Sequence, residues 1–157
     1  MSIRPLRRED KEPIHDLLRA TDVFSEEEIG VAIELIQISL EDENQKDYEI
    51  FSYTDSEERI VGYVCFGPTP ATQGTYDLYW VAVSPSEHGK GIGSQLLQFA
   101  EDHIRAKGAR FLIAETSSTL KYEKTRAFYE RKGFAKVAHV KEYYKPGDDL
   151  IIFGKYL

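Results

Sequence analysis

Cysteine, long apolar runs and closely spaced histidines are what this sequence of 157 residues has least of. Its one cysteine, Cys65, excludes an internal disulfide, and the apolar run 60–66 around it predicts a buried thiol rather than a nucleophile. No apolar run approaches the roughly 18 residues that a membrane helix needs. The charged start, residues 1–10, has no apolar signal segment. We therefore expect a cytoplasmic protein with no membrane partner.

Metal-binding patterns and positive charge are also scarce. The four histidines, His15, His88, His103 and His139, have no spacing typical of metal ligands, so we expect no bound metal. The 20 lysines and arginines face 27 aspartates and glutamates, which gives a formal net charge of −7. This balance argues against a polyanionic partner such as a nucleic acid.

Apolar periodicity and turn residues predict one α/β domain over residues 1–157, with a mixed sheet of about seven strands flanked by about four helices. Asp10 is expected to cap the first helix, which contains Leu18, and the apolar strand 111–114 has the composition of a central strand. The other expected strands are 3–6, 48–53, 59–66, 76–83, 134–144 and 150–156, and the other expected helices are 25–43, 92–104 and 122–132.

The second helix has the clearest start signal and an unusual surface. Ser25 and Glu28 have the spacing of a capping box. A helix that is apolar on two sides packs on the core and covers something else, either a substrate groove or a partner subunit, and the second option predicts a homodimer. The two apolar faces are Ile29, Ile33, Ile36 and Leu40, and Val31, Leu35 and Ile38.

Three alternate glycines, Gly89, Gly91 and Gly93, lie between a predicted strand and a predicted helix. The start of a helix has free N–H groups and a positive dipole, which suit an anion. Two familiar phosphate loops do not fit. The dinucleotide pattern fails at Ser94 and Leu96, and the nucleotide P-loop lacks its lysine before Ser94. A nucleotide-binding module is therefore disfavoured, and a tight connector remains the alternative to a phosphate loop of another kind.

The residues around these glycines resemble a known family. The segments 81–85 (VAVSP) and 88–93 (HGKGIG), followed by a leucine-rich helix, are similar to the acetyl-CoA-binding segment of the GNAT family of N-acetyltransferases. The segment 127–134 (AFYERKGF) is similar to the helix-to-strand signature of that family. His88 is a departure, because members usually have Gln or Arg there.

The resemblance implies acetyl-CoA as the acyl donor. Backbone groups of the strand before the loop would pair with the pantetheine arm, and the loop N–H groups would hold the pyrophosphate. Lys90 either adds charge or is only exposed. Tyr122 replaces an Asn with which many members contact the arm, so it belongs either to the cofactor or to the acceptor side. The implied cofactor-binding residues are Val81, Ala82, Val83, His88, Gly89, Lys90, Gly91, Ile92, Gly93, Ser94, Tyr122 and Tyr129.

The resemblance also implies catalytic roles for Glu115 and Tyr129. Acetylation of an amine needs a base for the amine proton and an acid for the departing thiolate. Glu115 follows strand 111–114 and is expected at its C-terminal end as the base. The alternatives are that Glu115 only holds a nearby backbone group or hydroxyl, or that Asp77 is the base. Tyr129 is expected as the acid, with simple core packing as its alternative.

We therefore expect an N-acetyltransferase that acts by direct attack of a primary amine of a small molecule or peptide. The alternative is a catalytically silent acyl-CoA-binding sensor or subunit, against which the presence of Glu115 and Tyr129 argues. The acidic helix 25–43, if it lies over the cleft, suits a cationic amine. Aromatic residues expected either to line the acceptor side or to pack the sheet are Tyr76, Tyr79, Trp80, Tyr143 and Tyr144.

Overall fold

The computed structural model describes all residues 1–157 and contains one seven-stranded mixed sheet in the order β1-β2-β3-β4-β5-β7-β6. Only β4 and β5 run parallel, and every other neighbouring pair is antiparallel. The strands are β1 (Ser2–Pro5), β2 (Glu49–Thr54), β3 (Ile60–Pro68), β4 (Thr75–Val83), β5 (Phe111–Ser117), β6 (Ala135–Lys145) and β7 (Asp148–Tyr156). The expected element order and the mixed α/β sheet are confirmed.

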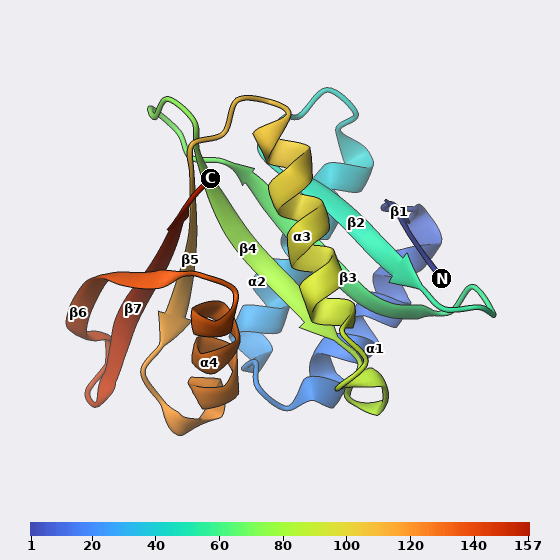
Figure 1. Ribbon diagram of the computed structural model, residues 1–157. Helices are drawn as coiled ribbons and strands as arrows, with labels where there is room; N and C mark the ends of the chain where they lie inside the picture. Colours follow the sequence, from blue (N-terminus) through green and yellow to red (C-terminus); the bar gives the residue numbers. More distant parts are fainter.

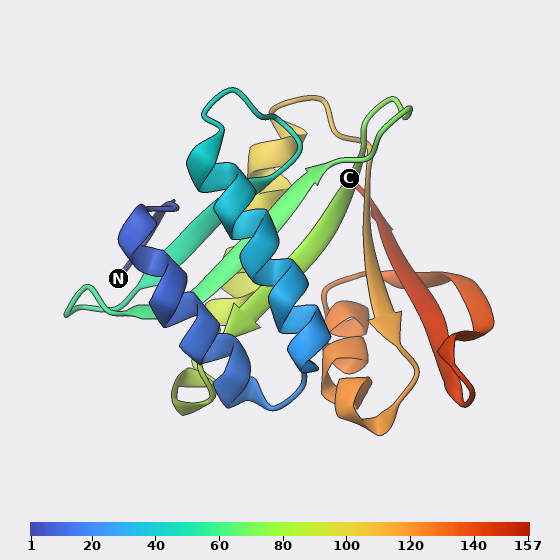
Figure 2. The same cartoon turned by 180° about the vertical axis from the view of Figure 1, so that it is seen from behind.

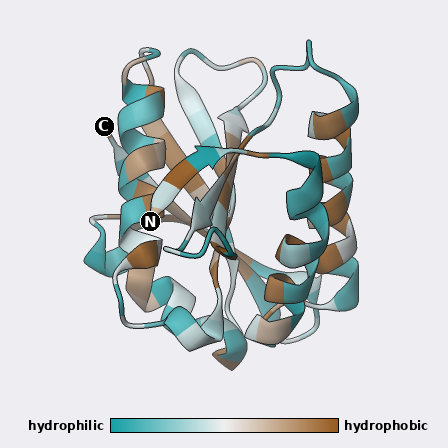
Figure 3. Ribbon diagram, turned by 90° about the vertical axis from the view of Figure 1, so that its right-hand side faces the viewer, coloured by the Kyte–Doolittle hydropathy of each residue, from teal (hydrophilic) through white to brown (hydrophobic).

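Four α-helices cover the two faces of this sheet: α1 (Lys11–Thr21), α2 (Glu26–Glu41), α3 (Ile92–Arg105) and α4 (Glu123–Arg131). Helices α3 and α4 lie on one face (Figure 1), and α1 and α2 lie on the other (Figure 2). The edge-on view shows the sheet between two layers of helices, which alternate between hydrophobic and hydrophilic stretches (Figure 3). No helix is both long and apolar enough to span a bilayer.

The core is divided by the sheet into two apolar clusters. On the α3 and α4 face, Leu96 and Leu112 are fully buried. On the α1 and α2 face, Ile14 and Ile36 are fully buried, and Cys65 is only 1% exposed. Burial raises the pKa of the Cys65 thiol well above its ordinary value. These contacts agree with the interpretation of Cys65 as a buried thiol.

Helix α2 begins as its sequence indicates. The Ser25 hydroxyl accepts a hydrogen bond from the Glu28 N–H, and the Glu28 carboxylate accepts one from the Ser25 N–H, both at 3.1 Å. The predicted capping box is therefore confirmed. The second apolar face is only partly free, because Leu35 is buried whereas Val31 is 47% and Ile38 is 37% exposed.

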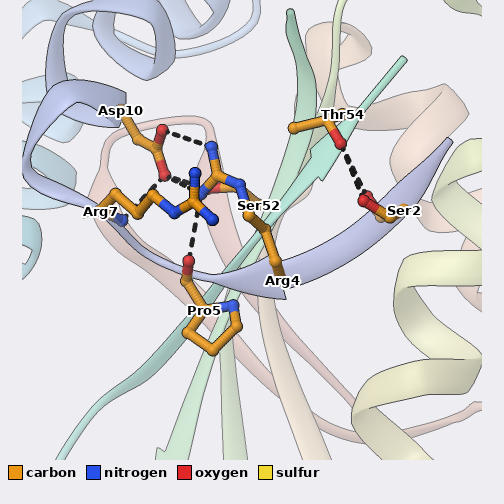
Figure 4. Close-up of polar contacts among 7 residues, drawn as sticks. All are labelled: Ser2, Arg4, Pro5, Arg7, Asp10, Ser52 and Thr54. Atoms are coloured by element: carbon orange, nitrogen blue, oxygen red, sulfur yellow. Dashed lines mark hydrogen bonds and ion pairs between the residues drawn. The ribbon is translucent and has the colours of Figure 1, made fainter. Parts of the chain in front are cut away.

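Asp10 stands at the N-cap position of α1, as expected, but its side chain does not cap the helix. Its carboxylate makes no cap hydrogen bond to α1 and instead accepts two hydrogen bonds from the Arg4 guanidinium, at 2.7 and 2.9 Å (Figure 4). The Arg7 N–H and the Ser52 hydroxyl also donate to it, each at 2.9 Å. Burial alone would raise the pKa of Asp10, but these hydrogen bonds hold it below its ordinary value. Two charge-assisted hydrogen bonds from arginine stabilise this buried carboxylate more than a cap hydrogen bond to the start of the helix would.

Strands β4 and β5 separate soon after they meet. Their parallel pairing covers only Thr75 with Phe111, Tyr76 with Leu112 and Asp77 with Ile113. Beyond this point the two strands diverge, and α4 lies in front of the opening between them (Figure 1). A register shift between β3 and β4 leaves Tyr79 without an opposing residue, and such a bulge re-aims the side chains beside it. The two clefts described below meet at this opening.

Candidate active site

The glycine-rich loop ends in a row of backbone N–H groups that have no acceptor within the protein. The N–H groups of residues 89–94 have no acceptor within the protein, and Gln95 is the first residue whose N–H bonds back, to the Gly91 carbonyl at 3.0 Å. This is the expected state of a helix start, and it creates a site that suits an anion. The predicted location of the loop at the start of a helix is confirmed.

Two of the loop glycines have backbone conformations that favour glycine. Gly89 has a φ of +82° and Gly91 a φ of +79°, in the left-handed region where a side chain is strained. Apart from the two adjacent residues, no part of the protein lies within 4 Å of where a Cβ of either glycine would stand. The space beside both glycines is therefore open to a ligand.

A cleft of about 390 Å³, here called the loop cleft, opens beside these N–H groups. Its far wall carries two cationic side chains of α4 that were not predicted from the sequence, Lys124 and Arg131. Neither has an ion-pair or hydrogen-bond partner in the protein. Their spacing of seven residues, two helical turns, was the available signal. The lining residues are Val81, Val83, Glu87, His88, Gly89, Gly91, Ile92, Gly93, Ser94, Lys124, Thr125, Phe128 and Arg131.

Two of the predicted cofactor-binding residues lie outside the loop cleft and the second cleft described below. Lys90 forms an ion pair with Glu87 at 2.6 Å and does not line either cleft. Ala82 is buried in the cluster on the α1 and α2 face. His88 lines the loop cleft, but its ring Nε2 is within 3.0 Å of the Val83 carbonyl oxygen, so this side chain is engaged with the end of β4.

The backbone of β4 faces the opening at alternate residues. The Ser84 N–H donates to the Val61 carbonyl at 2.8 Å, and the register pairs Val83 with Gly62 and Val81 with Val64. Hydrogen-bonded and non-hydrogen-bonded pairs alternate in an antiparallel ladder. The N–H and C=O groups of Val81 and Val83 therefore point away from β3, toward the side from which β5 has diverged. An extended ligand could pair with them there.

A second cleft, of about 330 Å³, continues from the first and is here called the carboxylate cleft. Val81 and Thr125 line both clefts, so the two meet at the opening between β4 and β5. The carboxylate cleft is lined by Phe24, Glu28, Val31, Asp77, Leu78, Tyr79, Trp80, Val81, Glu115, Tyr122, Thr125, Tyr129 and Tyr144.

The structure brings Glu115, Asp77 and Tyr129 into this cleft. The expected place of Glu115 at the end of its strand is wrong, because β5 continues to Ser117 and pairs Glu115 with Ile152 of β7. Partial burial, and then the nearby charge of Asp77, raise the pKa of Glu115 above its ordinary value. Asp77 itself accepts a hydrogen bond from the Thr69 hydroxyl at 2.6 Å.

Tyr129 is both packed and polar. Its ring lies 5.2 Å from that of Phe134 and 5.9 Å from that of Phe153, and the residue is only 5% exposed. Burial raises the pKa of its hydroxyl well above the ordinary value, so the group is protonated near neutral pH. The hydroxyl has no hydrogen-bond partner in the protein, although the residue borders the cleft.

Tyr122 lines the carboxylate cleft and not the loop cleft. Its hydroxyl donates to the Glu28 carboxylate, which joins the start of α2 to the segment before α4. Burial and this hydrogen bond raise its pKa well above the ordinary value. Of the aromatic residues expected near the acceptor, Tyr79, Trp80 and Tyr144 line the same cleft and the others do not.

Comparison with known proteins gives one consistent result. Residues 11–134 match the family described as "Acetyltransferase (GNAT) family". A GNAT-family protein of known crystal structure from Desulfovibrio desulfuricans is 40% identical, with a TM-score of 0.92 over 99% of this chain and 98% of that one. An aminoglycoside 6'-N-acetyltransferase complexed with coenzyme A is 20% identical, with a TM-score of 0.77 over 99% and 97% of the two chains, and shows the fold alone.

A curated relative matches over a shorter length. The S-(2-succino)cysteine N-acetyltransferase of Bacillus subtilis is 31% identical over 71 residues. This match spans 45% of the present chain and 43% of that enzyme, which is less than half of either.

Proposed function

This chain belongs to the GNAT family of acetyltransferases, and from that premise we propose that it transfers an acetyl group from acetyl-CoA to a primary amine by direct attack. The acceptor is an amine of a small molecule or peptide. One observation carries the proposal: unpaired backbone donors at one end of the opening between β4 and β5, and titratable side chains at the other.

The loop cleft binds the acyl donor in this proposal. The N–H groups of residues 89–94 hold the pyrophosphate, and Lys124 and Arg131 add positive charge in a chain whose net charge is negative. The pantetheine arm lies along β4, where the N–H and C=O groups of Val81 face the opening. The Val83 carbonyl is engaged with His88, so Val81 offers the freer pair of backbone groups.

The carboxylate cleft supplies the acid and the base. Glu115 accepts a proton from the substrate ammonium, directly or through water, and leaves a neutral amine. The amine nitrogen bonds to the thioester carbonyl carbon while the carbon–sulfur bond breaks. Tyr129 donates its proton to the departing thiolate, and the second proton of the acylated nitrogen returns to the Tyr129 oxygen, directly or through water, so that the products are the amide and the free thiol. The N–H of Val81 is suited to stabilise charge that develops on the thioester oxygen.

A combined binding and activity measurement tests the proposal. Acetyl-CoA and CoA should raise the melting temperature of the folded protein far more than NAD or ATP, because ligand at roughly 100 times its Kd adds about 2.7 kcal/mol to the free energy of unfolding. Free thiol should then appear when acetyl-CoA is mixed with amines from a panel. Protein that binds CoA but releases no thiol with any amine would instead support the silent sensor.

A further inference from the structure

The α2 side of the carboxylate cleft has no role in the reaction as described. Its wall is formed by Phe24, Glu28 and Val31 of the α2 side, together with Tyr122 and Tyr144. The charge and the aromatic surface on this side of the cleft indicate which further group of the acceptor binds there.

Glu28 places a negative charge there. One of its carboxylate oxygens accepts from the Ser25 N–H at 3.1 Å, and the other accepts from the Tyr122 hydroxyl. Both donors are neutral, and Glu28 forms no ion pair. The charge is therefore held in position without being neutralised.

The surroundings of Glu28 are aromatic and lack cations. The Phe24 and Tyr122 rings meet edge to face, with centroids 6.3 Å apart and planes at 76°. No lysine, arginine or histidine lines the cleft, and neither Asp77 nor Glu115 has an ion-pair partner. Aromatic faces attract cations, and more strongly where water is excluded. The cleft thus has three carboxylates and no counter-charge from the protein.

A separate observation marks this cleft as a ligand site rather than an acidic surface. The Tyr129 side chain is buried, with the residue 5% exposed, yet its hydroxyl has no partner within the protein. Unlike the Tyr63 hydroxyl, which is fully enclosed, the Tyr129 hydroxyl is itself open to the cleft. This unpaired hydroxyl of an otherwise buried side chain is therefore free to hydrogen-bond a molecule bound in the cleft.

We infer that Glu28, with Phe24 and Tyr122, forms a subsite for a second positive charge, so that the acceptor is a small amine with two cationic groups, such as a linear diamine. One ammonium loses its proton near Glu115 and is acetylated, while the other remains charged beside Glu28. The inference rests on the proposed function, because it assigns the acceptor of that same reaction. It excludes acceptors with carboxylate groups, which would meet three uncompensated negative charges.

The test compares short linear diamines with n-alkylamines and ω-amino acids of the same length, assayed near neutral pH, where alkylammonium groups are protonated. The kcat/KM of the diamine should exceed that of the matched alkylamine by about tenfold or more, and the amino acid should be the poorest acceptor. Glu28→Gln should bring the diamine-to-alkylamine ratio close to one. The amide keeps the hydrogen bond to the Ser25 N–H, so the helix start should persist.

Glu27→Gln is the matched control, because Glu27 is on the same helical turn, does not line the cleft and should leave the ratio unchanged. Binding is followed separately through the fluorescence of Trp80, which is the one tryptophan and lines the cleft. Equal kcat/KM for diamine and alkylamine in the unmodified protein would overturn the subsite while leaving the proposed function intact. A diamine that changes Trp80 fluorescence only when Glu28 is present, but is never acetylated, would support the subsite and overturn the proposed function.

Discussion

Three of the buried tyrosines differ in what their hydroxyl groups meet. The Tyr53 hydroxyl donates to the Gln95 side chain at 2.9 Å, and the Tyr63 hydroxyl is enclosed in the core without a partner. The Tyr129 hydroxyl is also unpartnered, but its residue borders the carboxylate cleft. The same missing hydrogen bond therefore has different consequences at positions 63 and 129.

Tyr129→Phe should lower kcat by about 10²-fold, because a positioned general acid contributes roughly 10²–10⁴ and a thiolate is a fairly good leaving group. The melting temperature and the CoA affinity should hardly change, since the ring packing with Phe134 and Phe153 is kept. Tyr63→Phe is the control: it removes an equally unpaired hydroxyl from the core and should leave kcat unchanged. Unaltered kcat in Tyr129→Phe would return Tyr129 to a packing role.

Glu115→Gln should reduce kcat most near neutral pH and less at high pH, where more of the amine is already neutral. The measurement is kcat against pH for both proteins. A loss that is the same at every pH would make Glu115 structural and would move the role of base to Asp77 or to solvent.

The raised pKa of Glu115 also predicts an effect on stability. A carboxyl with a raised pKa favours the folded state when protonated, so its contribution is present at low pH and is lost as pH rises through the folded-state pKa. Glu115→Gln should therefore raise the melting temperature at neutral pH but not below pH about 4, where the unfolded-state carboxyl is also protonated.

At the scale of elements, helix α3 is preceded by one glycine with a positive φ and followed by another. Gly91 and Gly108 have φ values of +79° and +86°, and apart from the adjacent residues no part of the protein lies within 4 Å of the place that a Cβ of either would occupy. Alanine at either position should cost about 1 kcal/mol of unfolding free energy from backbone strain alone.

Only Gly91→Ala should weaken CoA binding, because its methyl group enters the space beside the free N–H groups. Calorimetric titration of the two variants with CoA separates strain from ligand exclusion, since Gly108 is remote from the loop cleft. If both variants bind CoA equally well, the glycines do not hold the phosphates.

Local signals in the sequence were enough to predict the elements and the loop. The Ser25 capping box, the strand and helix periodicities and the glycines at 89, 91 and 93 each depend on neighbours a few residues away. The end of β5 was misplaced because Glu115 is polar, although its pairing with Ile152 keeps it in the strand. The position of Asp10 before α1 was predicted, but its side chain does not cap the helix because its carboxylate is bound by Arg4.

The parts of the site that sequence reasoning missed come from long-range packing. Glu28 and Tyr122 are 94 residues apart, and nothing local to either indicates that they touch. Lys124 and Arg131 reach the loop cleft only because α4 lies in the opening between β4 and β5. The family resemblance pointed to Glu115 and Tyr129, whereas the acceptor side required the fold.

On the scale of the whole molecule, the buried Asp10 carboxylate joins three elements: Arg4 in β1, the backbone before α1 and Ser52 in β2. Asp10→Asn leaves the Arg4 guanidinium, which is 18% exposed, without its counter-charge. Removal of one partner from a buried pair should lower the free energy of unfolding by about 3 kcal/mol.

The pH dependence of unfolding checks this assignment. A carboxyl whose folded-state pKa is lowered contributes stability above its ordinary pKa of about 3.9, and this contribution is lost as pH falls through the lowered value. The stability gap between the natural protein and Asp10→Asn should therefore narrow in acid. Glu57→Gln, which breaks the exposed pair with Arg59, should change the melting temperature little. A constant gap down to low pH would contradict the role assigned to Asp10.

The burial of Cys65 gives the molecule an internal reporter. It is the chain's one thiol, 1% exposed, in the cluster between the sheet and the first two helices. A thiol-specific dye therefore does not react with the folded chain. Its reaction then measures only the CoA thiol that each turnover releases. When the same dye does begin to label the protein, the rate measures how often the core beneath α1 and α2 opens.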